Sequence, residues 1–242
     1  MLFLNVGMPR SGTLWRYKLI RDLVIASGGK DGVNIRGKYL LHPFISGLNA
    51  DINTLTPKRL FPAMIPSLLG ERYVLNTHDY PRPFTNRQLA KNKLKAVYGF
   101  RDPRDCILSI LEYSRRAKPQ YSTVFLNIST VEEAVEFFHI FLHAYDLWNA
   151  SPNTLILKYE EMLERYESSV DKILDHLKLE IPQVELNKII TLYLPGQRSR
   201  AGEATHFEHG TAHRFRQEFN REELDFLADK LGPYLEKMGY PI

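Results

Sequence analysis

Short apolar runs alternate along the chain with longer segments in which apolar residues recur at helical spacing. The short runs predict four buried strands, at Leu2–Val6, Tyr73–Thr77, Lys95–Phe100 and Thr154–Lys158. The helical period predicts helices over Leu14–Ala26, Asp105–Arg116, Val131–Asn149, Tyr166–Leu177 and Arg221–Lys237. Because parallel strands need crossover connections, this alternation predicts an α/β fold with a mainly parallel central sheet flanked by helices on both faces.

In sheets of this kind, ligands bind beyond the carboxyl ends of the strands. The residues that follow the four predicted strands are therefore the first candidates for a functional site. They are Gly7–Trp15, His78–Pro81, Arg101–Asp105 and Tyr159–Glu161.

Composition narrows the class of protein without deciding its function. The 242 residues are 44% hydrophobic and 25% charged, which is typical of one globular domain, here residues 1–242. The net charge of +4 is spread along the chain, so we expect no nucleic-acid partner, although it suits a small polyanion. Cys106 is the only cysteine, which excludes an intrachain disulfide, and we expect it to be buried. We find no signal peptide and no apolar run of membrane-spanning length, and therefore expect a cytoplasmic protein.

The segment Gly7–Trp15 joins the first predicted strand to the first predicted helix. A glycine-bearing turn at this place presents backbone N–H groups and the positive helix end to an anion. Gly7 and Gly12 have the spacing of a nucleotide-binding P-loop, but Thr13-Leu14 stands where that motif has Lys-[Ser/Thr]. The cation lies inside the loop instead, at Arg10. The sequence therefore predicts an anion-binding loop that requires no metal.

Residues 9–15 resemble the phosphosulfate-binding loop of the cytosolic sulfotransferases, Pro-Lys-Ser-Gly-Thr-Thr-Trp. These enzymes use 3'-phosphoadenosine 5'-phosphosulfate (PAPS) as the sulfuryl donor and release adenosine 3',5'-bisphosphate (PAP). The resemblance implies a P-loop-NTPase-like fold with a modified, non-Walker loop. It also implies donor-binding roles for Arg10, Ser11, Gly12, Thr13, Leu14 and Trp15, with Arg10 replacing the lysine that stabilises the reacting bridge. Arginine is always charged and can contact two oxygens, so it can serve as an electrostatic clamp.

A second motif, Arg101-Asp102-Pro103-Arg104-Asp105, follows the third strand, with Ser109 eight residues beyond Arg101. Pro103 suits the first turn of a helix, and Asp102 can cap it. The run resembles the family's 3'-phosphate-binding segment, which assigns that role to Arg101 and Ser109. Arg104 and Asp105 are expected to form ion pairs.

The second strand ends at Thr77-His78, which resembles the family's Lys-Thr-His-Leu-Pro, whose histidine is the general base. The resemblance makes His78 the base, and the ordinary pKa of histidine suits proton abstraction near neutrality. Asn76 replaces the lysine of this motif, which weakens the positive field at the sulfuryl group.

Two weaker matches complete the resemblance. Tyr159 corresponds to a tyrosine near the adenine, and Gly210 matches the glycine of the family's Arg-Lys-Gly. Glu208-His209 occupies the Arg-Lys positions, so Arg198, Arg200 or Arg214 is expected to take over their contacts with the 3'-phosphate. Residues 30–70 and 117–130 are expected to form loops or short helices that shape the acceptor pocket.

The resemblance implies sulfuryl transfer to a hydroxyl or amine of a small acceptor by in-line displacement, and the acceptor could be a phenol, alcohol, amine or sugar. The alternatives are a non-catalytic module that binds PAP or a sulfated ligand, and a P-loop nucleotide kinase. A zinc site at His206, His209 and His213 would lack cysteine partners. His139 and His143 are expected to pack or cap a helix. No feature of the sequence indicates an oligomeric state.

Overall fold

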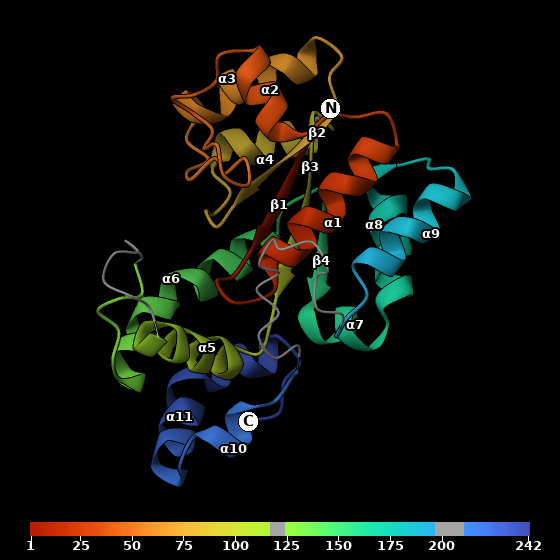
Figure 1. The fold of residues 1–242 in the computed structure, drawn as a ribbon. Helices are drawn as coiled ribbons and strands as arrows, with labels where there is room; N and C mark the ends of the chain where they lie inside the picture. The colour runs from red at the N-terminus through yellow and green to blue at the C-terminus, as the bar shows by residue number, and fades with distance from the viewer. Residues whose placement is uncertain (117–123, 197–210) are drawn as a thin grey trace.

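The centre of the molecule is a parallel sheet of four strands (Figure 1). Its order is β2-β1-β3-β4, with β1 at Leu2–Gly7, β2 at Tyr73–Thr77, β3 at Leu94–Phe100 and β4 at Thr154–Lys158. The computed structural model describes residues 1–116, 124–196 and 211–242. Every residue of β1, β2 and β3 is buried, as expected for strands covered on both faces.

Helices cover both faces of the sheet. On one side in Figure 1 lie α1 (Thr13–Ala26), α8 (Tyr166–Leu177) and α9 (Gln183–Leu192), and on the other lie α4 (Pro83–Ala90) and α6 (Val131–Asn149).

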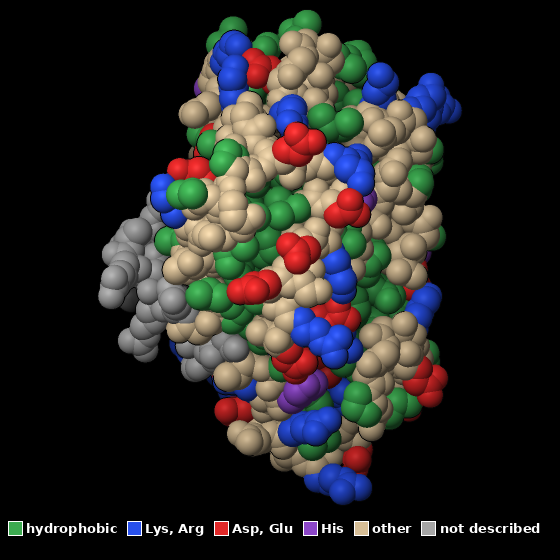
Figure 2. Space-filling view, turned by 90° about the vertical axis from the view of Figure 1, so that its right-hand side faces the viewer, with side chains coloured by type: hydrophobic (Ala, Val, Ile, Leu, Met, Phe, Trp, Pro, Cys, Tyr) green, Lys and Arg blue, Asp and Glu red, His purple; other side chains and the backbone are tan. Residues whose placement is uncertain are grey.

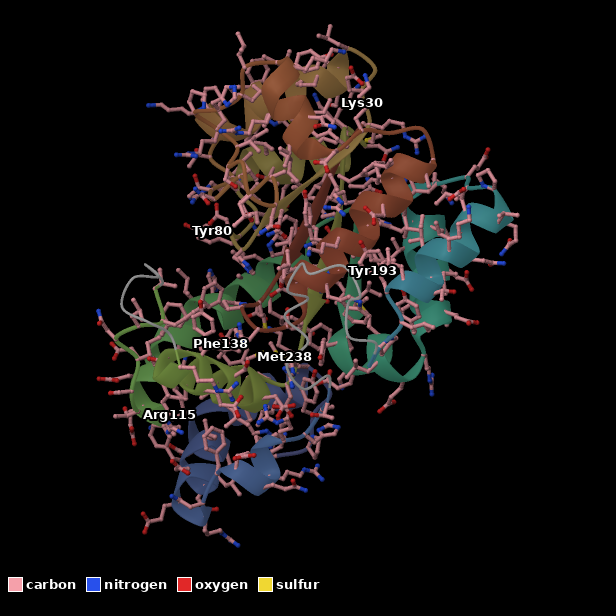
Figure 3. The ribbon with its side chains drawn as sticks, in the orientation of Figure 1. Lys30, Tyr80, Arg115, Phe138, Tyr193 and Met238 are labelled. Atoms are coloured by element: carbon pink, nitrogen blue, oxygen red, sulfur yellow. The ribbon has the colours of Figure 1, made fainter. Side chains whose placement is uncertain are left out.

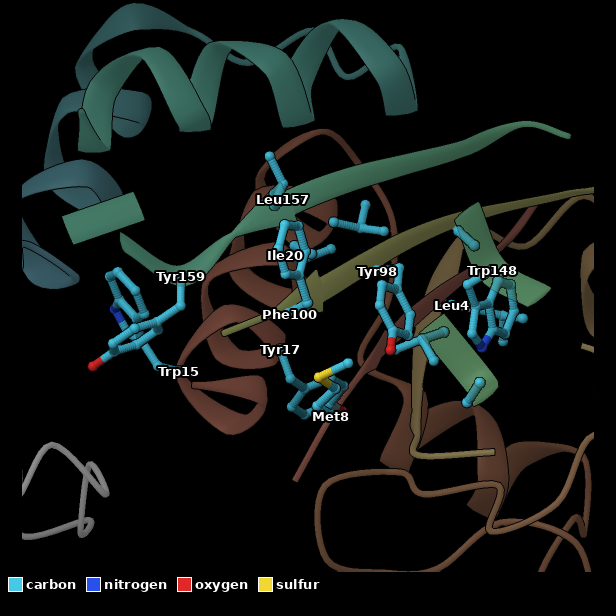
Figure 4. Packing of buried hydrophobic residues seen from close by; sticks show 14 of the residues in the cluster. Leu4, Met8, Trp15, Tyr17, Ile20, Tyr98, Phe100, Trp148, Leu157 and Tyr159 are labelled. Carbon is cyan, nitrogen blue, oxygen red and sulfur yellow. The ribbon is translucent and has the colours of Figure 1, made fainter. Parts of the chain in front are cut away.

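Side chains that alternate along a strand separate the two layers. The Asn5 amide contacts α1, donating to the Thr13 carbonyl at 3.1 Å. On the opposite face, Tyr98 of β3 stacks on Trp148 of α6, with ring centroids 6.2 Å apart (Figure 4). Asn5 and Tyr98 therefore mark the two faces of the sheet, since Asn5 contacts α1 and Tyr98 contacts α6.

The remaining helices extend this core at both ends of the strands. The short helix α7 (Tyr159–Glu164) follows β4 directly. Near the amino ends of the strands lie α2 and α3, and near the carboxyl ends lie α5, α10 and α11 (Figure 1). Their bounds are Gly32–Lys38, Pro57–Leu68, Pro103–Arg116, Phe215–Glu218 and Arg221–Lys237.

The predicted fold class is confirmed, and the four strands agree with the prediction to within one residue at each end. Residues 30–70, expected to form loops or short helices, contain α2 and α3, and α3 has Pro62 and Pro66 in its interior. Proline in a helix interior removes a backbone donor and normally argues against a helix, which is why the sequence pattern gave no bounds for α3. The domain assignment, residues 1–242, stays a prediction.

Three smaller expectations have mixed outcomes. Cys106 is fully buried, as predicted. His139 and His143 are exposed on α6, so the expectation that they pack or cap was wrong. No helix in the described ranges is long and apolar enough to span a bilayer.

On the face that carries α1, α8 and α9, acidic and basic side chains are interspersed (Figure 2).

Candidate active site

The four strand ends open into one cavity of about 410 Å³. Its lining includes at least one residue that follows each strand: the loop after β1, His78 after β2, Arg101 after β3 and Tyr159 after β4. From β1 the chain passes to β2, which lies on one side of β1, and then to β3, which lies on the other side. The cavity therefore lies at the point where the strand order reverses. This is where open α/β sheets bind ligands.

The loop after β1 is held by its own polar groups. The Met8 carbonyl accepts from the Ser11 hydroxyl at 2.7 Å and from the Thr13 hydroxyl at 3.1 Å. The first hydrogen bond of α1 runs from the Arg16 amide to the Gly12 carbonyl, so the amides of Thr13 and Leu14 precede the helical hydrogen-bond ladder. Such amides at a helix start, together with the positive end of the helix, form a binding site for an anion.

Gly12 is required here for two reasons. Its φ of 71° lies in the left-handed region, where side chains are disfavoured. A Cβ at this position would also lie 2.8 Å from Cε2 of Tyr159. The Tyr159 ring therefore packs directly on the backbone of the loop, which only glycine permits.

Aromatic rings close this side of the cavity. Trp15 meets Tyr159 edge to face at 6.4 Å and stacks on Tyr166 at 5.9 Å. Figure 4 shows the Trp15 and Tyr159 rings against each other. The Trp15 indole N–H donates to the Tyr193 carbonyl at 3.0 Å, and Figure 3 places Tyr193 beside α1. The indole is thus fixed in orientation before any ligand binds.

Arg101 is a buried cation at the end of β3. Its guanidinium lies over the Tyr159 ring, 4.6 Å from the centroid, and donates to Asp105 at 3.2 Å. It also donates to the carbonyls of Arg10 and Thr211, at 3.3 and 2.9 Å. Its Nε is buried and has no hydrogen-bond partner among the described residues. Arg101 therefore joins the first loop, α5 and the C-terminal segment around the cavity.

Arg10 lies between the loop and α5. Its Nε donates to the Ser109 hydroxyl at 2.9 Å, and its guanidinium lies over the Tyr113 ring at 5.1 Å. Arg10 itself adopts a left-handed φ of 64°, which turns the chain toward Gly12. Two residues predicted for different phosphates of the donor are thus hydrogen-bonded to each other.

One ring nitrogen of His78 has a hydrogen-bond partner, and the other has none among the residues that the structure describes. Nδ1 lies 2.7 Å from the Gly7 carbonyl, which can only accept, so Nδ1 carries the proton and Nε2 holds the lone pair. The His78 side chain is exposed at the cavity. The protein groups around it nevertheless lower its pKa, mainly by desolvation and further by the charge of Arg16, while the hydrogen bond to Gly7 opposes this shift. A lowered pKa favours the neutral imidazole, which is the form that can accept a proton.

We call the residues contributed by the four strand ends the strand-end wall: Arg10, Gly12, Thr13, Leu14, Trp15, His78, Arg101 and Tyr159. Ser109 of α5 and Thr211 line the cavity beside Arg10 and Arg101, and the helix wall is the rest of the lining from α5, α6 and the segments beside them: Glu112, Val124, Phe125, Phe137, Phe141 and Arg214. The helix wall contains a chain of rings, since Phe125 lies 5.5 Å from Phe137, and Phe137 lies 5.4 Å from Phe141.

One ion pair interrupts the apolar surface of the helix wall. Arg214 donates to both carboxylate oxygens of Glu112, with one contact at 3.0 Å. This pairing raises the pKa of Arg214. Arg214 was one of three arginines expected to replace missing 3'-phosphate contacts, and its charge is already committed to Glu112. Arg198 and Arg200 lie outside the described residues.

Most of the predicted site residues line this single cavity. Ser11 does not, because its hydroxyl is turned into the loop and the residue is buried. Gly210 lies outside the described residues. Asp102 caps α5 as expected, accepting from the Arg104 amide at 3.0 Å. The Arg104–Asp102 and Arg101–Asp105 ion pairs are both buried.

The residues of the helix wall other than Arg214 were not among the predicted site residues. Glu112 comes one helical turn after Ser109, and Phe137 and Phe141 are four residues apart, so each pair shares a helix face. This spacing was available from the sequence, but it is equally typical of core residues. No described residue in the range 30–70 lines this cavity, whereas Val124 and Phe125 of 117–130 do. The expectation that residues 30–70 shape the acceptor pocket stays a prediction.

Within the described ranges, no group of three or more His, Cys, Asp or Glu side chains could hold a metal ion. Of the three histidines considered for zinc, His206 and His209 lie outside those ranges. The metal-free site stays a prediction.

Curated sequences similar to this chain are named as sulfotransferases. The chain is 25% identical over 211 residues to cytosolic sulfotransferase 12 of Arabidopsis thaliana, covering 77% of this chain and 59% of that protein. It is 24% identical over 197 residues to the amine sulfotransferase of Oryctolagus cuniculus, covering 76% and 58%. The matched region thus spans about three fifths of the length of these relatives.

Solved structures share the fold. Mouse sulfotransferase SULT7A1 complexed with PAP aligns over 97% of this chain and 83% of its own, with a TM-score of 0.61 and 18% identity. The model of the sulfotransferase domain matches residues 3–232. This chain therefore belongs to the sulfotransferase domain family.

Proposed function

We propose that this protein transfers the sulfuryl group of PAPS to a hydroxyl or amine of a small acceptor. The observation that carries the proposal is the convergence of the first loop, His78, Arg101 and Ser109 on one cavity. These residues come from separate parts of the chain, and only the fold brings them together.

The strand-end wall fits the donor's chemistry. PAPS carries negative charge at both its 5' and 3' positions, and the wall offers the start of α1 for one and Arg101 for the other. Trp15 and Tyr159 provide apolar ring surface beside these groups, as an adenine requires. We assign Arg10, Gly12, Thr13, Leu14 and Trp15 to the donor, together with Arg101, Ser109 and Tyr159.

The proposed reaction is an in-line displacement at sulfur. The acceptor's oxygen or nitrogen forms a bond to sulfur while the bond from sulfur to the bridging oxygen of PAPS breaks. The acceptor's proton passes to Nε2 of His78, and PAP leaves with the bonding electron pair. Arg10 and the amides at the start of α1 stabilise the negative charge that grows on the leaving phosphate, an effect worth about 3–4 kcal/mol per donor in other enzymes.

The helix wall favours acceptors with an apolar body. Phe125, Phe137 and Phe141 line the cavity with apolar rings, so an aromatic or aliphatic acceptor is preferred to a sugar. The pair of Glu112 and Arg214 provides one polar position within this wall.

Calorimetric titration with PAP in EDTA, beside ATP, tests the donor site. We expect binding of PAP that is much tighter than binding of ATP and that is lost in Arg101→Ala but kept in Arg115→Ala, an exposed residue of α5. Turnover is then measured with PAPS and p-nitrophenol, benzyl alcohol or benzylamine. Binding of PAP without turnover of any acceptor would favour a non-catalytic module, and a magnesium requirement with ATP turnover would favour a kinase.

A further inference from the structure

Arg16 is a buried arginine directly behind the proposed active site. It follows Trp15 on α1 and is 1% exposed. Its Nε donates to Asn5 at 2.9 Å, and its Nη2 donates to the Val6 carbonyl at 2.5 Å. The guanidinium thus lies against the carboxyl end of β1.

Two glycines make room for this guanidinium. A Cβ on Gly99 would lie 1.7 Å from Nη1 of Arg16, and a Cβ on Gly7 would lie 2.6 Å from Nη2. Gly7 and Gly99 are partners in the register of β1 and β3. The backbone of both strand ends therefore contacts Arg16 where any other residue would exclude it.

No carboxylate pairs with Arg16 in the described part of the chain. Its polar network runs through asparagines: Asn5 donates to Asn76 at 2.7 Å, and Asn76 donates to Asp51 at 2.5 Å. Burial lowers the pKa of Arg16 to about 10, so the guanidinium is still charged at neutral pH. Burial also raises the pKa of Asp51 to about 6, and this carboxyl is two side chains away. A buried charge without a counter-ion is costly, and the fold retains it.

Arg16 and His78 act on consecutive carbonyls. Arg16 binds the Val6 carbonyl, and the next one, that of Gly7, accepts from Nδ1 of His78. The Arg16 charge also contributes to the lowered pKa of His78. Other charged or titratable groups lie near His78. Asp79 is adjacent in the chain and is bound by Arg82, and Tyr98 lies on β3. The remaining ones line the same cavity: Arg10, Arg101, Glu112, Tyr159 and Arg214.

We infer that Arg16 is a positioning residue for the proposed reaction: it fixes the strand end that orients His78 and places a permanent positive charge behind the site. This inference rests on the proposed function. Position 76, where the sulfotransferase motif described above has a lysine, carries Asn76, which is linked through Asn5 to Arg16. The positive charge that the motif's lysine would place at the end of β2 is thus supplied by Arg16 on α1. Asn76 and Asn5 link the end of β2 to Arg16.

The test measures the protonation of His78 directly. The imidazole carbon-bound protons of His78 are followed by NMR from pH 5 to 8 in the wild type, Arg16→Gln, Arg16→Lys and Arg21→Gln, with His78→Gln for assignment. We expect Arg16→Gln to raise the pKa of His78, because the neighbouring charge is gone. Arg16→Lys should restore most of the wild-type titration. Arg21, further along α1, pairs with Asp22, and its substitution should leave the titration unchanged.

The same variants are assayed with PAPS and the acceptor that the wild type uses best. In Arg16→Gln we expect kcat/KM to fall more at pH 6 than at pH 8, because a base with a raised pKa is more protonated at the lower pH. The Kd for PAP should change less than kcat/KM, since Arg16 does not line the cavity.

If Arg16→Gln does not fold, Asn5→Asp, which keeps Arg16, is used for the same titration of His78. It places a carboxylate against Nε of Arg16 and should raise the pKa of His78 in the same direction. An unchanged His78 titration in the folded variants would overturn the inference. The NMR measurement needs no turnover, so a protein that transfers no sulfuryl group refutes the proposed function without deciding the role of Arg16.

Discussion

The strand-end wall and the helix wall face the same cavity but are held in different ways. In the strand-end wall, Arg101 is held by Asp105 and two carbonyls, and His78 by the carbonyl of Gly7. In the helix wall, Phe137 and Phe141 are half-buried and held by apolar contacts with each other and with the core. Directed hydrogen bonds fix both the position and the orientation of a group, whereas apolar contacts fix mainly its volume.

This difference separates two tasks. Under the proposed function, a donor that is always the same molecule would be matched by groups fixed by the strand ends, which leave little freedom for substitution. An acceptor surface built from side chains on helices could then change in size and shape without disturbing the sheet. We therefore expect substitutions in the strand-end wall to affect catalysis, donor binding or stability, and those in the helix wall to affect acceptor choice.

The largest effect is expected for His78→Ala. General-base catalysis typically contributes about 10²–10⁴-fold, so kcat should fall by that factor while the Kd for PAP stays within about twofold. In the wild type, kcat/KM should rise with pH through the pKa of His78 and level off above it. Because that pKa is lowered from 6.5, the acidic limb should lie below pH 6.5. An acidic limb that persists in His78→Ala would assign the base to another group.

Gly12→Ala should produce the next largest effect, on stability. The new methyl group meets the Tyr159 ring at 2.8 Å in a backbone conformation that already disfavours side chains. We expect the free energy of unfolding to fall by about 2–4 kcal/mol, measured by urea denaturation. Gly28→Ala is the matched control, since Gly28 has a φ of 88° but open space around it. That variant should lose about 1 kcal/mol. Equal losses would show that Tyr159 moves aside freely.

Arg101→Gln should weaken donor binding without abolishing the fold. Hydrogen bonds to charged groups contribute about 1.5–3 kcal/mol, so the Kd for PAP should rise about 10- to 100-fold by calorimetry. Asp105 keeps two other donors, the amides of His213 and Phe215, at 2.7 and 3.0 Å. The melting temperature should therefore change modestly. A Kd unchanged from the wild type would remove Arg101 from the donor site.

The same contrast explains what the sequence could predict. The strand ends were found because buried strands are continuous apolar runs, and the residues after them carry chemistry that is unusual in a loop. Arg10, His78 and Arg101 were identified before their contacts were known, and the structure brings them to one cavity. Their roles stay predictions until tested.

What the sequence could not predict depends on long-range contacts. Phe137 and Phe141 have the spacing of ordinary core residues, and only the packing of α6 beside α5 turns them toward the cavity. In the sequence, nothing distinguishes Arg16 from the other basic residues of α1, Lys18 and Arg21. The burial of Arg16 depends on two glycines, Gly7, which is 9 residues before it, and Gly99, which is 83 residues after it.

Phe141→Leu should give the smallest effect and the sharpest test of the two-wall comparison. The substitution removes part of a ring from the helix wall, so an acceptor with an apolar body loses about 1 kcal/mol of contact or less. The acceptor KM should therefore rise about three- to fivefold, while the Kd for PAP and kcat stay near the wild-type values. Ile140→Leu is the control, because Ile140 is on the same helix but 54% exposed and outside the cavity lining. A change in the Kd for PAP as large as the change in the acceptor KM would mean that the two walls do not act separately, since the aromatic part of the helix wall would then be shaping the donor site as well.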